Sequence, residues 1–249
     1  MEHFLSDNVR IAYRVEGEGD PIVLVHGFAS THVVNWVEPG WVDCLVGEGF
    51  QVIMMDLRGH GASEKLFDPA LYDRHLMAQD IANLVHHLGH VRVDIMGYSM
   101  GAMLALRLAR LMPEMCRRVI LAGVGEVMFA PSRSSDAVVN ALLADNPRES
   151  KDAIGRAFRA FADKNSQNRQ ALAACYSTPR HQLTSDDLKT ATGPVLVVTG
   201  ERDVIAGAPE PLAAALPRGE IAVIAKRDHM RTVGDPAYKQ VVLDFLRRT

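Results

Sequence analysis

This 249-residue chain is most constrained by six short apolar runs that are separated by helical patterns. A continuous apolar run, with no alternation of polar residues, is typical of a parallel strand that is buried on both faces of a sheet. The runs are residues 21–26, 51–56, 92–97, 118–122, 194–200 and 220–225. Because they alternate with helices, we predict an α/β fold with a mostly parallel, doubly wound sheet that is covered by helices on both faces.

The two ends of the chain add further elements. Residues 4–6 and 9–15, which Asp7 and Asn8 join, predict an opening β-hairpin. Helices are predicted over residues 72–88, 101–111 and 236–248. The last of them begins with a proline and ends in arginines, residue types that suit the first and last turns of a helix.

One interval lacks any strand-like run. Residues 124–192, here called the insertion, contain only short helical patches at residues 135–144, 151–161 and 168–176. Strand-like runs lie on both sides of this interval. We therefore predict a core formed by residues 1–123 and 193–249 and a helical insertion between them, with no separate domain.

Composition excludes several classes of partner. A formal net charge of −3 and a pI near 6.4 give no basic surface for nucleic acid or for an acidic membrane. The most apolar stretch, residues 100–112, contains two arginines and is too short to cross a bilayer. The first ten residues contain no apolar signal-peptide region. We expect a soluble, cytoplasmic protein with a small-molecule partner, and a homo-oligomer stays possible.

Neither the cysteines nor the histidines predict a metal site. Cys44, Cys116 and Cys175 are odd in number and widely spaced, which favours free buried thiols. His86 and His90 have a spacing that can bind zinc, but the glutamate of H-E-x-x-H is absent and a glycine between them marks the end of a helix. We expect no metal and no cofactor.

The strongest local motif is Gly97-Tyr98-Ser99-Met100-Gly101, a G-x-S-x-G between a predicted buried strand and a predicted helix. A sharp strand-to-helix turn strains the serine backbone, and the two glycines leave room for it. The turn also places the hydroxyl at the positive end of a helix. The motif therefore predicts that Ser99 is a catalytic nucleophile.

A serine hydroxyl needs a base, and the base needs an acceptor that fixes its tautomer. His229 follows the last predicted strand, and Asp203 follows the strand before it, so the chain order Ser, Asp, His suits this fold. Asp228 and Glu201 are the competing acids. Asp228 adjoins His229 in sequence, and neighbouring residues rarely present their side chains to each other as required.

A tetrahedral intermediate also needs hydrogen-bond donors. The N–H of Met100 directly follows the nucleophile. The loop after the first buried run supplies a second candidate, the N–H of Phe28, because Gly27 permits a chain reversal there. We predict that these two groups form the oxyanion hole, and that His26 holds the loop backbone instead of acting as a base.

Together these residues resemble the α/β-hydrolase-fold superfamily, in the branch of serine esterases and lactonases with a short helical cap. The resemblance is carried by His26-Gly27-Phe28, residues 56–63 (DLRGHGAS), residues 97–101 (GYSMG), residues 200–203 (GERD) and His229. It implies that the insertion is a cap over the site. It also implies that residues 56–63 form a structural turn in which Asp56 and Arg58 tie loops together.

The resemblance further limits the chemistry. Haloalkane dehalogenases and epoxide hydrolases of this fold use an aspartate as nucleophile, so Ser99 argues against both. Carbon–carbon bond hydrolases usually show further Asn and Arg positions that this sequence does not place. One departure from the family is Asp228, which stands where a glycine commonly precedes the catalytic histidine.

We therefore predict a hydrolase of carboxylic esters or lactones with a small to medium acyl group, acting through an acyl-enzyme. Thioesterase, carbon–carbon hydrolase and perhydrolase activities on the same triad stay open, as does a non-catalytic receptor that binds a ligand in this fold. Aromatic side chains are the candidate substrate contacts. These are Trp36, Tyr98, Phe129 and Phe158, and packing of the insertion onto the core is the alternative role for those in the insertion.

Overall fold

The computed structural model describes residues 1–131, 136–146, 150–179 and 182–248. Its centre is an eight-stranded sheet with the order β1-β2-β4-β3-β5-β6-β7-β8. The strands are β1 (Glu2–Ser6), β2 (Val9–Glu16), β3 (Asp20–Val25), β4 (Phe50–Met55), β5 (Val93–Tyr98), β6 (Cys116–Ala122), β7 (Val195–Gly200) and β8 (Gly219–Ile224). The pairs β1–β2 and β2–β4 are antiparallel, and all others are parallel. The predicted α/β fold class is confirmed.

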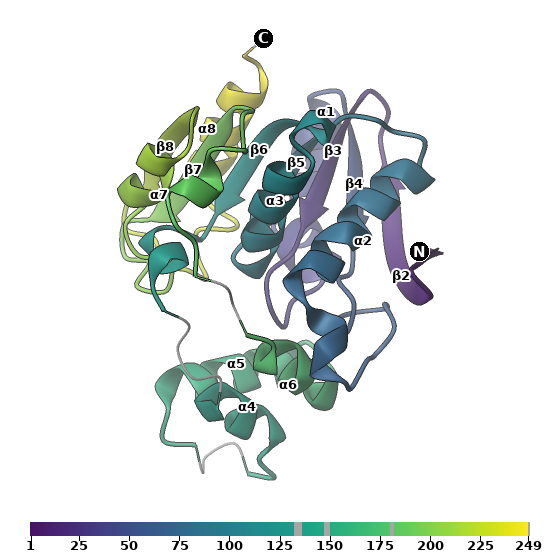
Figure 1. Cartoon of the computed structure of the whole chain (residues 1–249), viewed down its shortest axis with the longest axis vertical. Coiled ribbons are helices and arrows are strands. Elements are labelled where there is room, and N and C mark those ends of the chain that lie inside the picture. The colour runs from purple at the N-terminus through teal and green to yellow at the C-terminus, as the bar shows by residue number, and fades with distance from the viewer. Residues whose placement is uncertain (132–135, 147–149, 180–181, 249) are drawn as a thin grey trace.

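Helices cover both faces of this sheet (Figure 1). On one face lie α1 (Trp41–Gly47) and α8 (Pro236–Leu246), where Trp41 and Tyr238 join an apolar cluster with β3, β4 and β7. On the other face lie α2 (Arg74–His87), α3 (Met100–Leu111) and α7 (Glu210–Ala215), which share a larger cluster. The sheet is therefore doubly wound, as predicted.

Side-chain caps set the starts of the longer helices. The Asp73 carboxylate accepts a hydrogen bond from the His75 N–H at the start of α2, and Asp235 does the same for Ala237 in α8. Such caps satisfy N–H groups that the first turn of a helix leaves without a partner. The sequence analysis predicted α2, α3 and α8 but missed α1 and α7, which have only seven and six residues.

Between β6 and β7 the described residues contain helices and no strand. The helices are η4 (Glu126–Phe129), α4 (Asp136–Leu143), α5 (Ala153–Lys164), α6 (Arg169–Ser177) and η6 (Asp186–Leu188). Figure 1 shows α4, α5 and α6 grouped beyond one end of the sheet. The predicted start of the first patch, Ser135, lies outside the described residues.

Two contacts position these helices. The Thr178 hydroxyl, directly after α6, donates a 2.8 Å hydrogen bond to the carbonyl of Pro69 in η2 (Pro69–Tyr72), which precedes α2. The buried Arg159 of α5 donates to the carbonyls of Ala141 and Ala144 at the end of α4. The second contact satisfies carbonyls that the end of a helix leaves free. None of the described helices combines the length and apolarity needed to span a bilayer.

Candidate active site

The site forms where the parallel strands end. Ser99 directly follows β5, Asp203 lies three residues after β7, and His229 lies five residues after β8. The carboxyl ends of parallel strands meet at one edge of a sheet, which is where α/β proteins place their sites. Three residues far apart in sequence are thereby brought together.

Ser99 occupies a strained turn between β5 and α3. Its backbone has φ of 53° and ψ of −115°, a region that side-chain-bearing residues rarely adopt. A Cβ on Gly97 would collide with the backbone of Gly101, and a Cβ on Gly101 would collide with the backbone of Val25. The two motif glycines are therefore needed for the close approach of β3, β5 and α3 that holds the serine in place.

A chain of hydrogen bonds links the three side chains. Ser99 Oγ lies 3.1 Å from His229 Nε2, and His229 Nδ1 lies 2.8 Å from Asp203 Oδ2. Asp203 Oδ1 in turn accepts bonds from the backbone N–H groups of Ile205 and Ala206, at 3.1 and 2.9 Å. Asp203 and His229 are both buried. This is the geometry that lets a histidine take a serine proton while a carboxylate fixes its tautomer.

The two competing acids lie elsewhere. Asp228 Oδ1 accepts from the N–H groups of Met230 and Arg231, so its carboxylate closes the turn that contains His229. Glu201 Oε2 accepts from the N–H of Lys226 at 2.6 Å. Neither carboxylate is hydrogen-bonded to the imidazole, which leaves Asp203 as its acid partner.

The second predicted element, the loop after β3, packs against the serine turn. Ser30 N–H donates to Gly27 O at 3.3 Å across a turn in which Ala29 has a φ of 58°. Asn35 Oδ1 holds the Gly27 N–H at 3.1 Å, and a Cβ on Gly27 would lie 3.4 Å from Ser99 Cβ. Phe28 thus sits in a turn beside the nucleophile. Met100 is the first residue of α3, so its N–H has no acceptor within the helix.

A buried histidine pair supports this loop from behind. His26 Nδ1 lies 2.8 Å from Gly27 O, and Leu57 N–H donates to His26 Nε2 at 3.0 Å, which requires a neutral ring protonated on Nδ1. Burial lowers the pKa of His26 and lowers that of its neighbour His60 to about 3, so both stay uncharged. The structural role predicted for His26 agrees with these contacts.

Residues 56–63 form the turn that the sequence predicted. Asp56 Oδ1 lies 2.8 Å from both the N–H and Nδ1 of His32, and its Oδ2 accepts from Ala62 N–H. Arg58 forms two 2.7 Å bonds with the buried carboxylate of Asp80 in α2. Both side chains tie separate segments to the core.

Comparison with known proteins now adds the family. The sequence model of the alpha/beta hydrolase fold matches residues 20–172. The chain belongs to this family. The match begins at β3 and contains the serine turn and much of the insertion.

Curated relatives of this alpha/beta hydrolase differ in their activities. A soluble epoxide hydrolase from Corynebacterium sp. (strain C12) is 36% identical over 42% of this chain and 35% of its own length. A second relative is the dihydrolipoyllysine-residue acetyltransferase component of the acetoin cleaving system of Pseudomonas putida. It is 28% identical over 95% of this chain and 66% of its own length. A 2-hydroxymuconate semialdehyde hydrolase from Pseudomonas sp. (strain CF600) is 26% identical over 97% of this chain and 92% of its own length. The chain thus spans about a third of the length of the epoxide hydrolase and about two thirds of the length of the acetyltransferase component.

Solved structures show the same fold. A hydrolase from Pseudomonas aeruginosa PA01 has a TM-score of 0.83 at 23% identity, covering 99% of this chain and 98% of the other. An esterase from Exiguobacterium antarcticum has a TM-score of 0.82 at 20% sequence identity, and the alignment covers both chains fully. An enol-lactonase from Burkholderia xenovorans LB400 has a TM-score of 0.75 at 22% sequence identity, covering 99% of this chain and 100% of the other. At these identities the likeness establishes the fold of this hydrolase and leaves its substrate class open.

The four aromatic side chains predicted to contact substrate have different surroundings in this alpha/beta hydrolase. Trp36 is fully buried in the core cluster of α1 and α8, with its ring 6.3 Å from that of Trp41, so the prediction that it lines the pocket is wrong. Phe129 of η4 packs against the larger core cluster. Phe158 of α5 lies edge-on to Phe28 at 5.3 Å between ring centroids. Phe158 is therefore placed beside the site.

The side chain of Tyr98 supports the loop that contains His229. It is 5% exposed, and its hydroxyl donates a 2.5 Å bond to the carbonyl of His229. Its ring lies 5.5 Å from the imidazole, so it holds the histidine loop and presents little surface to a substrate. Sequence reasoning also missed Asn35, which fixes Gly27, and Gly123, where a Cβ would lie 3.1 Å from His229 Cε1. A glycine directly after a buried strand was the only local signal for Gly123.

No group of three or more potential metal ligands gathers among the residues that the structure describes. α2 ends at His87, and Gly89 has a left-handed φ of 77°. The chain therefore turns between His86 and His90 and does not continue the helix that a zinc site at this spacing requires.

Proposed function

We propose that this alpha/beta hydrolase cleaves a carboxylic ester or lactone of small to medium acyl group through an acyl-enzyme on Ser99. The observation that carries the proposal is the unbroken hydrogen-bond chain from Ser99 Oγ through His229 to Asp203. In the proposed first step Ser99 Oγ attacks the substrate carbonyl carbon while His229 Nε2 accepts its proton. Asp203 keeps Nδ1 protonated and stabilises the imidazolium.

Negative charge develops on the carbonyl oxygen at this point. We assign its stabilisation to the N–H groups of Phe28 and Met100, which flank the serine turn. When the intermediate collapses, the carbon–oxygen bond to the alcohol breaks and His229 gives its proton to the leaving oxygen. Water then repeats the sequence on the acyl-enzyme, with His229 first accepting and then returning a proton, and Ser99 is released.

The nucleophile argues against epoxide hydrolysis, although an epoxide hydrolase is among the relatives. That reaction proceeds through an alkyl ester of an enzyme carboxylate, and Ser99 offers a hydroxyl. Carbon–carbon bond hydrolysis is the second candidate, because the relative named 2-hydroxymuconate semialdehyde hydrolase aligns with 97% of this chain. The same Ser99 and His229 would serve that reaction.

The test is hydrolysis of p-nitrophenyl acetate and butyrate by the purified chain and by Ser99→Ala. We expect release of p-nitrophenol that falls by at least about 10³-fold in the variant, because the nucleophile is lost. Equal rates in the two proteins would contradict the proposal and favour a ligand-binding role. A panel of lactones, thioesters and vinylogous 1,5-diketones, at equal concentration, ranks the candidate substrate classes.

A further inference from the structure

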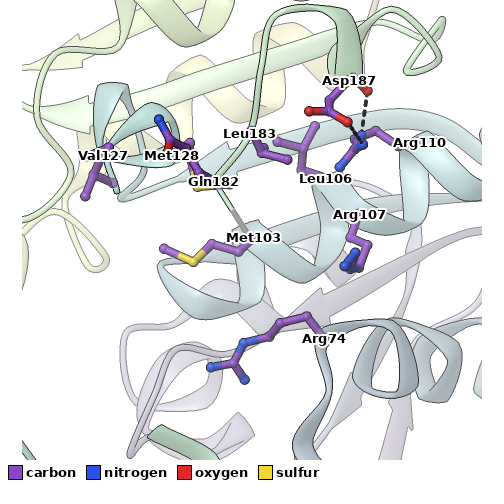
Figure 2. A pocket seen from close by; sticks show the side chains of 11 residues that line it. Arg74, Met103, Leu106, Arg107, Arg110, Val127, Met128, Gln182, Leu183 and Asp187 are labelled. Atoms are coloured by element: carbon purple, nitrogen blue, oxygen red, sulfur yellow. Dashed lines mark hydrogen bonds and ion pairs between the residues drawn. The ribbon is translucent and has the colours of Figure 1, made fainter. Parts of the chain in front are cut away.

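A second feature beside the site is a pocket of about 370 Å³ against helix α3 (Figure 2). Its apolar wall is formed by side chains of α3, of η4 and of the segment before η6. These are Met103, Leu106, Val127, Met128 and Leu183. Three arginines, Arg74, Arg107 and Arg110, and one acid, Asp187, also line it. Such a pocket suits a ligand that is mostly apolar and carries one negative group.

Only one of the three arginines has a carboxylate partner among the described residues. Arg110 forms a 2.8 Å ion pair with Asp187, drawn as a dashed line in Figure 2. Arg107 has no hydrogen-bond or ion-pair partner in the part of the chain that the structure describes. Burial lowers the pKa of Arg110, and the charge of Arg107 lowers it further against the opposite effect of Asp187. The pocket therefore holds uncompensated positive charge.

Arg74, at the start of α2, is the more unusual cation. Its Nη1 contacts the sulfur atoms of Met77 and Cys175, at 3.1 and 3.6 Å, and its Nη2 donates to the Cys175 carbonyl at 3.4 Å. Sulfur is a weak acceptor. Its Nε is buried and has no partner. A guanidinium in these surroundings retains donors for the paired oxygens of a carboxylate.

The pocket begins one helical turn from the nucleophile. Met103 N–H donates to Ser99 O at 3.1 Å, and residues 99, 103, 106 and 110 follow the three- and four-residue spacing of one helix face. At a rise of 1.5 Å per residue, Met103 lies about 6 Å and Arg107 about 12 Å from Ser99 along the axis of α3. An extended chain that advances roughly 1.2 Å per bond covers that span in about five to ten bonds.

We propose that this pocket, the Arg74–Arg107 pocket, binds a distal carboxylate on the acyl part of the substrate. The inference rests on the proposed function, because the acyl group must be attached at Ser99. The preferred substrates are then esters or lactones of medium-chain acids that carry a second carboxylate. The methionine and leucine side chains contact the chain, and Arg74 and Arg107 pair with its charged end.

A matched pair of substrates tests the charge alone. One is the p-nitrophenyl monoester of suberic acid, and the other is its methyl ester, which has the same chain without the charge. We expect kcat/KM of the wild-type protein to be at least about 10-fold higher for the charged ester, the size of effect that a hydrogen bond to a charged group gives. In the double variant Arg74→Gln/Arg107→Gln we expect this preference to be lost, so that its kcat/KM values for the two esters lie within about 2-fold of each other.

The control variant is Arg156→Gln. Arg156 is an exposed arginine of α5 whose Nη1 donates to the Ser150 carbonyl and which does not line the pocket. We expect it to keep the full preference. Equal kcat/KM of the wild-type protein for the two esters, or a preference that survives in the double variant, would overturn the proposal while the neutral ester still reports esterase activity.

A binding measurement separates this proposal from the proposed function. Suberate itself should raise the Tm of the wild-type protein and of Ser99→Ala, and should leave the Tm of the double variant unchanged. That result supports the Arg74–Arg107 pocket even where neither ester is hydrolysed. A Tm of the wild-type protein that suberate does not change would overturn it, whatever the esterase assay shows.

Discussion

The sheet and the insertion differ in how completely their side chains are buried near Ser99, and the difference separates two parts of the proposed function. The strands lie between two apolar clusters in which most side chains are fully buried. The insertion shares the larger cluster through buried side chains such as Leu172 of α6, but beside Ser99 it meets the core through the partly buried rings of Phe158 and Tyr176 against Phe28. We infer that the sheet sets the chemistry at Ser99 and that the insertion affects which acyl group reaches it.

The largest expected effect concerns the sheet side of the site. Asp203→Asn should lower kcat for p-nitrophenyl butyrate by about 10³- to 10⁴-fold, because an amide no longer fixes the tautomer of His229. The matched control is Asp228→Asn, which adjoins the histidine; its carboxylate accepts from the N–H groups of Met230 and Arg231 and pairs with the exposed Arg231 guanidinium at 3.7 Å. We expect its kcat to stay within about 2-fold of wild type. Similar losses in both variants would contradict the assignment of the acid.

A second pair of variants compares the two regions directly. Trp41 is fully buried, and its Nε1 donates a 2.7 Å bond to the Val233 carbonyl, so Trp41→Ala should lower the free energy of unfolding by about 3–5 kcal/mol. Phe158→Ala in the insertion should cost about 1–2 kcal/mol or less and change KM more than kcat. Urea unfolding and ester kinetics measure both. If Phe158→Ala destabilised the chain as much as Trp41→Ala, the insertion would belong to the same cooperative core.

The smallest expected effect is a change of stability with pH that comes from the buried histidines behind the loop after β3. Burial lowers the pKa of His60 to about 3 in the folded chain, against 6.5 for an unperturbed histidine. The unfolded state therefore binds more protons between these values, so stability is complete above pH 6.5 and falls as the pH drops toward 3. We expect the urea concentration at the unfolding midpoint to decrease as the pH is lowered from 7 to 4.5.

The variant His60→Asn should show a weaker fall over the same range, since His26 still contributes its own lowered pKa. An unchanged pH slope in the variant would show that His60 does not titrate on unfolding in this window.

The sheet was predictable from sequence because parallel strands that are buried on both faces consist of continuous apolar runs. The runs at residues 21–26 and 194–200 became β3 and β7 with ends that differ by a single residue. Pro236 in its first turn helped to make α8 readable in the same way. The order of Ser99, Asp203 and His229 along the chain also predicted their meeting, because parallel strands bring their carboxyl ends to one edge.

Other features depend on which segments meet, and no local pattern records that. Trp36 was expected beside a substrate, yet the short helix α1 that buries it was not readable from seven residues. Tyr98 was expected in the pocket because it adjoins Ser99, but its side chain is buried and its hydroxyl donates to the His229 carbonyl. The pairing of Arg74 with sulfur atoms joins α2 to α6, 101 positions apart.

The most direct test of the account is the site at which a serine-reactive fluorophosphonate attaches. Mass spectrometry of digested protein should find one labelled residue, Ser99. Labelling should disappear in Ser99→Ala and should slow by about 10³-fold or more in Asp203→Asn, since the same hydrogen-bond chain activates the hydroxyl. Attachment at another residue, or no attachment at all to the folded protein, would contradict the claim that Ser99, His229 and Asp203 form a working nucleophile.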